Sequence, residues 1–273
     1  MLRRARALWN SNGRSLGAVL VILLLWELAC RLPPIQSLGL PSPEATANGL
    51  IARWQILVSH GAITGYETLV GFLVALAGGL SGAVVLSLSP RLAAALWPTI
   101  LFLQIMPKVA IAPLLLLWLG FGLLPKVIIA FLISFFPILA NAYAGLQSVD
   151  EETNELARSM HAAGVRYFLY FTLPQALPRI LSGARIAITF AVVGAVVAEF
   201  IGADKGLGYL VILSARNLDM GLMLAAIFTL TCLGVGLYGL VSLAEHYLIP
   251  WHISRRRAEM RDLSETRATA GGL

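Results

Sequence analysis

The stretch ELARSMHAAGVRYFLYFTLPQALP, residues 155–178, interrupts a chain that is otherwise mostly apolar. It contains two arginines, one histidine and two prolines, and long hydrophobic runs lie on either side of it. Charged side chains are costly in the hydrocarbon core of a bilayer, so we expect this stretch to lie outside that core. The number and direction of the apolar runs around it then decide the fold.

The composition indicates a membrane protein. Of the 273 residues, 58% are hydrophobic and 12% are charged, and the mean hydropathy is +0.82, whereas soluble domains carry about twice that share of charge. The net charge of +6 comes from Lys and Arg that flank the apolar runs, which favours orientation in a bilayer over nucleic-acid binding. Cys30 and Cys232 lie within apolar segments and lack CxxC spacing, so no metal site is expected.

Six apolar runs approach or exceed the length that a helix needs to cross about 30 Å of hydrocarbon. They are Leu16–Leu32, Tyr66–Leu88, Ala93–Leu119, Leu124–Leu146, Ile180–Ile201 and Leu222–Ile249. The expected fold class is therefore all-α, a polytopic membrane bundle of six transmembrane helices. The third run contains Pro98, Pro107 and Pro113, which predicts a kinked or locally unwound helix, because proline removes a backbone hydrogen bond. Such irregular backbone is tolerated only beside protein or a water-filled path.

Six crossings place both termini on the same side of the membrane. That side then holds 14 of the 20 Lys and Arg residues, namely Arg3, Arg4, Arg6, Arg14, Arg91, Arg158, Arg166, Arg179, Arg185, Arg255, Arg256, Arg257, Arg261 and Arg267. Since basic residues concentrate in cytoplasmic loops, we expect both termini in the cytoplasm. The predicted organisation is a cytoplasmic tail over residues 1–15, a transmembrane domain over 16–252 with a cytoplasmic segment over 148–178, and a cytoplasmic tail over 253–273. Glu27 does not fit a lipoprotein cleavage box, so the first run is interpreted as a retained span.

The polar stretch is expected to contain a short amphipathic helix. Ser148 and Glu151 have the spacing of a capping box, and Gly164 is a natural helix stop. The apolar stripe of this helix comprises Leu156, Met160, Ala163 and Tyr167. A helix lying on the lipid surface and a docking helix for a soluble partner both remain open, although anionic lipid would repel the acidic start. Pro174 and Pro178 predict a stiff elbow before the next span.

At these residues the chain resembles the permease subunits of binding-protein-dependent ABC importers. The cytoplasmic loop of that family has the form E-A-A, three residues, G, nine residues, I, one residue, L-P. Here the same spacing is occupied by Glu155, Leu156, Ala157, His161 in place of Gly, Phe171 in place of Ile, Leu173 and Pro174. The segments GLPSPEAT, MPKVAIAPLLLLWLGFG, GLGYLV and PWH resemble the branch that imports taurine, aliphatic sulfonates, nitrate, aromatic acids or vitamin precursors.

The resemblance covers nearly everything from Leu16 to His252 and implies a type I importer permease in the bacterial inner membrane. It implies three kinds of partner: a second permease copy in a homodimer, two cytoplasmic ATPase subunits and an extracytoplasmic solute-binding protein. The residues implied in coupling to the ATPase are Glu155, Leu156, Ala157, Met160, His161, Gly164, Leu173 and Pro174. The 273 residues contain no GxxxxGK(S/T) loop, so ATP and Mg²⁺ are expected on the partner ATPase and no cofactor on this chain. The implied solute is a small anion or organic solute such as nitrate, taurine, an alkanesulfonate, an aromatic acid or a vitamin precursor.

Polar residues at membrane depth are candidates for the translocation pathway, because burying them in lipid is costly. The candidates are Gln104, Lys108, Asn141 and Glu199. Lys108 and Glu199 could instead pair or cap exposed backbone, while Gln104 and Asn141 could hydrogen-bond between helices. Glu67 and Glu245 are expected at the membrane interfaces.

Gly206 and Gly208 indicate a turn or bend on the outer side of the membrane. The residues alone fit an ordinary glycine-rich loop as well as an outer gate or a contact with the binding protein. The family resemblance favours the gate or contact.

Two other classes of function are less consistent with the sequence. An autonomous channel or secondary transporter usually places a selectivity loop or paired broken helices at mid-membrane, and a single broken span is expected here. A membrane-embedded enzyme needs clustered catalytic groups, whereas the four histidines are scattered without an HExxH or GxSxG motif. We therefore expect neither catalytic residues nor a metal site.

Overall fold

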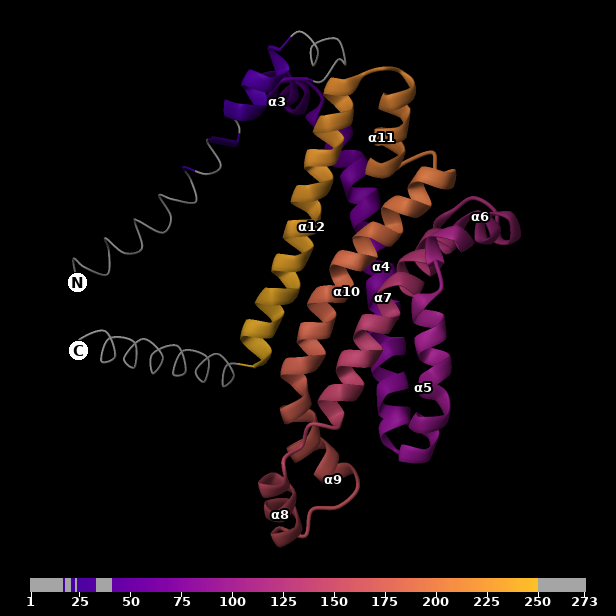
Figure 1. Ribbon diagram of the computed structural model, residues 1–273, viewed down its shortest axis with the longest axis vertical. Coiled ribbons are helices and arrows are strands. Elements are labelled where there is room, and N and C mark those ends of the chain that lie inside the picture. Colours follow the sequence, from indigo (N-terminus) through magenta and orange to yellow (C-terminus); the bar gives the residue numbers. More distant parts are fainter. Residues whose placement is uncertain (1–16, 18–20, 23, 33–40, 250–273) are drawn as a thin grey trace, which may run out of the picture.

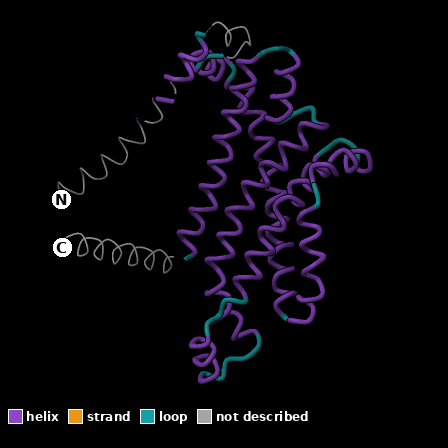
Figure 2. The backbone as a smooth tube through the Cα atoms, viewed as in Figure 1, coloured by secondary structure: helices purple, strands orange, loops and turns teal. Residues whose placement is uncertain are grey.

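A computed structural model describes Gly17, residues 21–22, residues 24–32 and residues 41–249. This part of the chain is built from helices and connecting loops and contains no strand (Figure 2). The predicted tails over 1–15 and 253–273 and the PWH motif lie outside the described residues, and the first expected span, Leu16–Leu32, is described only in part.

From residue 41 onward the helices follow one another with short connections. Their bounds are α3 Pro43–Ala52, α4 Trp54–Ser87, α5 Pro90–Ile105, α6 Lys108–Leu119, α7 Leu123–Leu146, α8 Glu151–Ser159, α9 Val165–Tyr167, a π-helical turn Phe168–Thr172, α10 Leu173–Gly202, α11 Leu207–Arg216 and α12 Met220–Leu248.

The long helices α4, α7, α10 and α12 run roughly along the long axis of the molecule (Figure 1). The short helix α8 projects at one end of this bundle, and α3 and α11 lie at the opposite end. We call these the α8 end and the α11 end. Four described helical segments are long and apolar enough to cross a membrane, with α9, the π-turn and α10 forming one of them, and the bent pair α5–α6 makes a fifth if it is one span. The all-α membrane bundle is confirmed, and the count of six stays a prediction.

The core between α4, α7 and α10 depends on small residues. A Cβ atom added at Gly194 of α10 would lie 2.7 Å from the Ala130 Cα of α7, and one added at Gly71 of α4 would lie 2.5 Å from the Ala130 Cβ. These distances leave no space for a side chain, so the three helix backbones approach closely. Close packing of this kind is a main source of helix association in membranes, where lipid is as apolar as the side chains.

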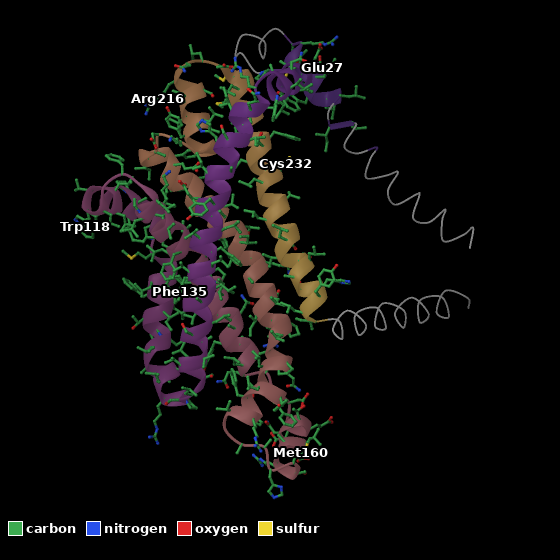
Figure 3. All side chains as sticks on the ribbon, turned by 180° about the vertical axis from the view of Figure 1, so that it is seen from behind. Glu27, Trp118, Phe135, Met160, Arg216 and Cys232 are labelled. Carbon is green, nitrogen blue, oxygen red and sulfur yellow. The ribbon has the colours of Figure 1, made fainter. Side chains whose placement is uncertain are left out.

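The third apolar run is broken, as its prolines predicted. Helices α5 and α6 meet at an angle of 83°. Met106 takes an extended conformation immediately before Pro107, because a residue that precedes proline is disfavoured in the helical region. Helix α5 runs beside the bundle, whereas α6 projects sideways from it (Figure 1), and Trp118 on α6 is 69% exposed (Figure 3).

Two predicted helix starts are wrong. Helix α4 begins at Trp54 rather than Tyr66, because the polar and small residues before Tyr66 pack against α11 and α12 instead of forming a loop. Helix α10 begins at Leu173 rather than Ile180, so Pro174 and Pro178 lie within the helix and do not form a separate elbow. Pro174 lies in the first turn of α10, directly after the π-helical turn, whereas Pro178 lies inside the helix.

Candidate functional site

Helix α8 is capped by a different residue from the one predicted. Asp150 accepts a hydrogen bond from the Thr153 N–H over 2.8 Å and is the N-cap. Ser148 instead donates to the Gly145 carbonyl of the preceding helix over 2.7 Å. An aspartate cap accepts a hydrogen bond from a free backbone N–H, and its negative charge interacts favourably with the positive end of the helix dipole. The acidic start of this segment therefore stabilises α8 itself.

The C-terminus of α8 lies at Ser159, five residues before the predicted stop at Gly164. The Ala162 N–H donates to the Ala157 carbonyl over 2.9 Å, and the His161 N–H donates to the Arg158 carbonyl over 3.0 Å. These two bonds form a Schellman motif, which needs a left-handed residue at the position of His161. His161 has φ +52° accordingly. The family pattern has Gly at this position because glycine adopts that conformation without steric cost.

Gly164 provides a second left-handed residue, with φ +58°, and α9 starts directly after it. The chain therefore reverses between two left-handed positions, His161 and Gly164, before it enters the π-turn and α10. Leu173 and Pro174 are the first residues of α10 and are partly buried. This stretch brings α8 back against the start of α10 (Figure 1).

Polar contacts attach α8 to the residues around the start of α10. Gln175 Nε2 donates to Thr153 Oγ1 over 2.7 Å, and the Tyr167 hydroxyl donates to Asn154 Oδ1. Ala157, on the face of α8 that is turned toward the bundle, is 1% exposed. The buried face of α8 therefore consists of Thr153, Asn154 and Ala157.

The opposite face of α8 is uncovered. Leu156 and Met160 are 55% and 66% exposed, and Met160 lies at the tip of the molecule (Figure 3). Glu155 and His161 are exposed beside them. We call Glu155, Leu156, Met160 and His161 the docking face. The predicted stripe is only partly continuous, because Tyr167 turns inward to Asn154 while Leu156 and Met160 point away from the bundle.

A cavity of about 630 Å³ lies between this segment and the adjacent ends of α4 and α7. Its lining includes Leu88 of α4, Leu146 of α7, and Asn154 and Tyr167 of the α8–α9 segment. The space between α8 and α4 is therefore a cavity, whereas α8 packs directly against α10.

Two of the four pathway candidates lie on the broken helix pair. Gln104 is exposed near the end of α5, and Lys108 opens α6. Lys108 Nζ donates to the Gln104 carbonyl over 2.6 Å and lies 4.7 Å from the centre of the Phe136 ring. No ion pair of Lys108 exists within the described residues. The pairing of Lys108 with Glu199 that the sequence left open is therefore not formed.

The other two candidates lie between helices of the same chain. Asn141 Nδ2 donates to the Pro137 carbonyl over 2.8 Å, and Gly183 of α10 packs directly against the Asn141 side chain. Glu199 is 1% exposed. Its Oε1 accepts from the Thr64 hydroxyl over 2.7 Å. Both residues make contacts expected of helix packing, and their part in a pathway stays a prediction.

Gly206 and Gly208 form a turn that closes over Glu199. The Gly208 N–H donates to Glu199 Oε2 over 2.6 Å, and the Gly206 N–H donates to His60 Nδ1 over 3.0 Å. Gly206 has φ +113°, and a Cβ added there would lie 2.0 Å from Glu199 Oε1. The turn requires glycine both for its conformation and for the space that the carboxyl group occupies.

Three ion pairs between residues far apart in the sequence were not predicted. Glu67 and Lys126, 4% and 5% exposed, pair over 2.6 Å between α4 and α7, so the prediction of an interfacial Glu67 is wrong. Arg185 of α10 pairs over 3.1 Å with Glu245 of α12, in the half of those helices nearer the α8 end. The partners of each pair are far apart in the sequence, and no local pattern links them.

The third ion pair joins the start of α4 to the start of α12. Arg53 donates to Asp219, and Asp219 caps α12 by accepting from the Leu222 N–H over 3.0 Å. The Arg53 guanidinium holds the pKa of the Asp219 carboxyl below its usual range. The described residues contain no group of three or more His, Cys, Asp or Glu side chains that could hold a metal ion.

Comparison with known proteins agrees with this arrangement. The chain is 35% identical over 233 residues to the "Probable ABC transporter permease protein" of Haemophilus influenzae, covering 85% of this chain and 95% of that protein. It is 34% identical over 259 residues to the "Riboflavin transport system permease protein RibX" of Chloroflexus aurantiacus, covering 92% and 96%. It is 30% identical over 237 residues to the "Putative aliphatic sulfonates transport permease protein SsuC" of Bacillus subtilis, covering 86% of each.

The fold also matches a solved ABC transporter. A chain of the methionine ABC transporter MetNI, in an inward-facing conformation, superimposes with a TM-score of 0.60 at 20% identity, covering 73% of this chain and 97% of that chain. The family model described as "Binding-protein-dependent transport system inner membrane component" matches residues 68–249. That match includes α8, the broken pair α5–α6 and the Gly206–Gly208 turn. The chain therefore belongs to the family of binding-protein-dependent transport system inner membrane components, the permeases of ABC importers.

Proposed function

We propose that this permease forms the solute pathway of an ATP-driven importer as a homodimer and is driven by two separate ATPase subunits that hold the docking face of α8. The observation that carries this proposal is the contrast between the two faces of α8. One face is attached to α10 by the Gln175–Thr153 bond and by buried Ala157. The other exposes Leu156 and Met160 beside Glu155 and His161.

A lipid surface is a poor partner for this docking face. The first turn of α8 carries Glu151 and Glu152 after the Asp150 cap, and the negative cytoplasmic leaflet repels such a cluster. A groove on a soluble protein can cover two apolar side chains and complement the adjacent carboxylates at the same time. We therefore propose the α8 end as the cytoplasmic side, with both chain termini there and the solute-binding protein at the α11 end.

Force reaches the membrane through α10. When the ATPase subunits close on ATP and Mg²⁺, the two α8 helices are drawn together, and α10 moves with them because Gln175 and Thr153 bridge the two elements. The open cavity on the α4 side of α8 leaves room for this movement. The nucleotide and its metal ion are bound by the ATPase, so this chain supplies the lever and the pathway and carries out no hydrolysis.

The exposed half of α5 is the proposed contact with the second permease copy. Near its start α5 is attached to the bundle through buried Ala93 and the contact of Trp97 with Tyr143. Toward its end, Phe102 and Ile105 are 71% and 82% exposed. A second copy covers this surface and places the Gln104–Lys108 break of each chain beside a central pathway.

The solute proposed is a small anion or an organic solute with an anionic group, drawn from nitrate, taurine, alkanesulfonates, aromatic acids and vitamin precursors. The aliphatic sulfonates named for one relative belong to this class. Lys108 supports the choice, because its ammonium group is held by a carbonyl oxygen and an aromatic face and no described residue supplies a counter-ion.

Copurification tests the docking assignment. The tagged permease is expressed with an importer ATPase that supports its uptake activity, and Leu156→Asp is compared with Leu218→Asp, which changes an exposed leucine at the α11 end (78% exposed). We expect Leu156→Asp to release the ATPase and abolish ATP-driven uptake while the permease still inserts in the membrane, and Leu218→Asp to retain the ATPase. An intact complex with Leu156→Asp contradicts the proposal.

A further inference from the structure

A buried polar cluster joins α4, α7, α10 and α11 toward the α11 end. Glu67, Lys126 and Glu199 are 4%, 5% and 1% exposed. Lys126 Nζ donates to Glu67 Oε1 over 2.6 Å, while Glu199 accepts from the Thr64 hydroxyl and the Gly208 N–H. The cluster thus contains two carboxyl groups and one ammonium group, all away from solvent.

If every group were ionised, the cluster would carry one net negative charge. A buried charge without compensation is expensive, and a carboxyl group in that position takes up a proton instead. His60 contacts the turn rather than either carboxyl group, because its Nδ1 lies 3.0 Å from both the backbone nitrogen and the carbonyl oxygen of Gly206. Asp204, which lines a cavity together with Lys126, is another acid and adds no positive charge.

One atom of the cluster lacks a hydrogen-bond donor. Glu67 Oε2 is buried, and no described residue donates to it. Glu199 is hydrogen-bonded to Thr64, which lies one helical turn before Glu67 on α4, so the two carboxyl groups are neighbours. Two neighbouring ionised carboxylates repel each other and only accept hydrogen bonds, so the arrangement is unfavourable unless one of them carries a proton. A single proton removes the net charge and supplies a hydrogen-bond donor.

We propose that Glu67 and Glu199 share one proton, which keeps the Glu67–Lys126–Glu199 cluster neutral and holds the Gly206–Gly208 turn against α4 and α10. A cavity of about 400 Å³, lined in part by Lys126, Gly202 and Asp204, brings the molecular surface to one member of the cluster. The shared proton is independent of the ATPase docking proposed above, and its test requires neither the ATPase nor the solute.

Infrared spectroscopy of the full-length permease in nanodiscs at neutral pH tests the proposal. The carbonyl stretch of a protonated carboxylic acid is resolved from the bands of ionised carboxylates and shifts in D₂O. We expect this band in the wild-type protein. It should disappear in both Glu67→Gln and Glu199→Gln, because removing either acid leaves one carboxylate balanced by Lys126. It should persist in Asp204→Asn, which changes an exposed acid beside the cluster.

Thermal unfolding gives a second, independent readout. Each single glutamine variant leaves the cluster neutral, whereas Glu67→Gln with Glu199→Gln leaves Lys126 buried without a counter-ion. The melting temperature of the double variant should therefore fall by more than the sum of the decreases in the two single variants. If the wild-type protein lacks the acid band and its melting temperature rises when sodium replaces choline, a bound cation neutralises the cluster instead of a proton. That result overturns the proposal, and so does an acid band that survives both single changes.

Discussion

Gln175 of α10 donates a hydrogen bond from Nε2 to Thr153 Oγ1 of α8 over 2.7 Å. The two residues come from opposite sides of the loop that reverses the chain at His161 and Gly164. With Ala157 buried beneath α8, this bond makes the helix a continuation of the α10 packing unit rather than a free appendage. A displacement of α8 by a partner is consequently a displacement of a membrane helix.

Removing this bond should weaken coupling without preventing assembly. Thr153→Val keeps the shape of the side chain and removes the acceptor, and a neutral hydrogen bond contributes about 1 kcal/mol, or roughly a fivefold change in an equilibrium constant. We expect ATP-driven uptake in proteoliposomes to fall by about that factor while the ATPase still copurifies. Thr153→Ser, which retains a hydroxyl, is the control. Equal uptake by the valine and serine variants would show that the bond does not transmit movement.

His161 occupies a conformation that favours glycine, so His161→Gly should stabilise the end of α8. The left-handed conformation costs a residue with a Cβ about 1 kcal/mol relative to glycine, and some of this gain is offset by the greater freedom of glycine in the unfolded chain. Hydrogen exchange of the amides between Met160 and Gly164 should slow by up to about fivefold. His161→Ala keeps the Cβ and should not slow it. Equal protection in the two variants would falsify the assignment of strain to His161.

The Arg53–Asp219 contact predicts a pH-dependent contribution to stability. Because Arg53 lowers the pKa of Asp219 in the folded protein, the contribution is fully present above the ordinary aspartate pKa of about 3.9 and is lost as pH falls through the lowered folded value. Both side chains are partly exposed, so the effect should stay within about 1 kcal/mol. Melting curves from neutral pH down to acid should show a smaller decrease for Asp219→Asn. Parallel curves for the two proteins would exclude this contribution.

Lys108 should attract anions to the break between α5 and α6. In a background with Cys30 and Cys232 replaced by serine, Gln104→Cys is labelled with a sulfonate-bearing and with an ammonium-bearing methanethiosulfonate reagent. The positive charge of Lys108 should raise the rate of labelling by the anionic reagent relative to the cationic reagent, because a nearby charge changes the local ion concentration. Lys108→Gln should lower this ratio of rates severalfold. A ratio independent of Lys108 argues against an anion pathway at this site.

The membrane helices were largely predictable because their signal is local. Long apolar runs located α5–α6, α7 and α12, and the prolines predicted the break at Pro107. The start of α4 was missed, since the residues from Trp54 to Gly65 include polar and small side chains typical of a loop. Their helical structure is supported by tertiary contacts, such as Thr64 with Glu199 and Gly61 with Leu207.

Helix α8 was predictable in position but not in its ends. Its spacing pattern located Glu155 through Pro174, yet the stop was assigned to Gly164 because histidine gives no sequence signal for a left-handed residue. The Glu67–Lys126 pair was missed for a different reason. The two residues are 59 positions apart in sequence, and each by itself resembles an interfacial residue.

The central claim, that α8 docks a cytoplasmic ATPase through its exposed face, is tested most directly by site-specific photocrosslinking in intact membranes. A benzophenone amino acid replaces Met160, and as the control it replaces Leu218, an exposed residue at the α11 end (78% exposed). The account predicts a permease–ATPase crosslink from position 160 and none from position 218. A crosslink from position 160 to lipid or to an extracytoplasmic protein, with none to the ATPase, would contradict it.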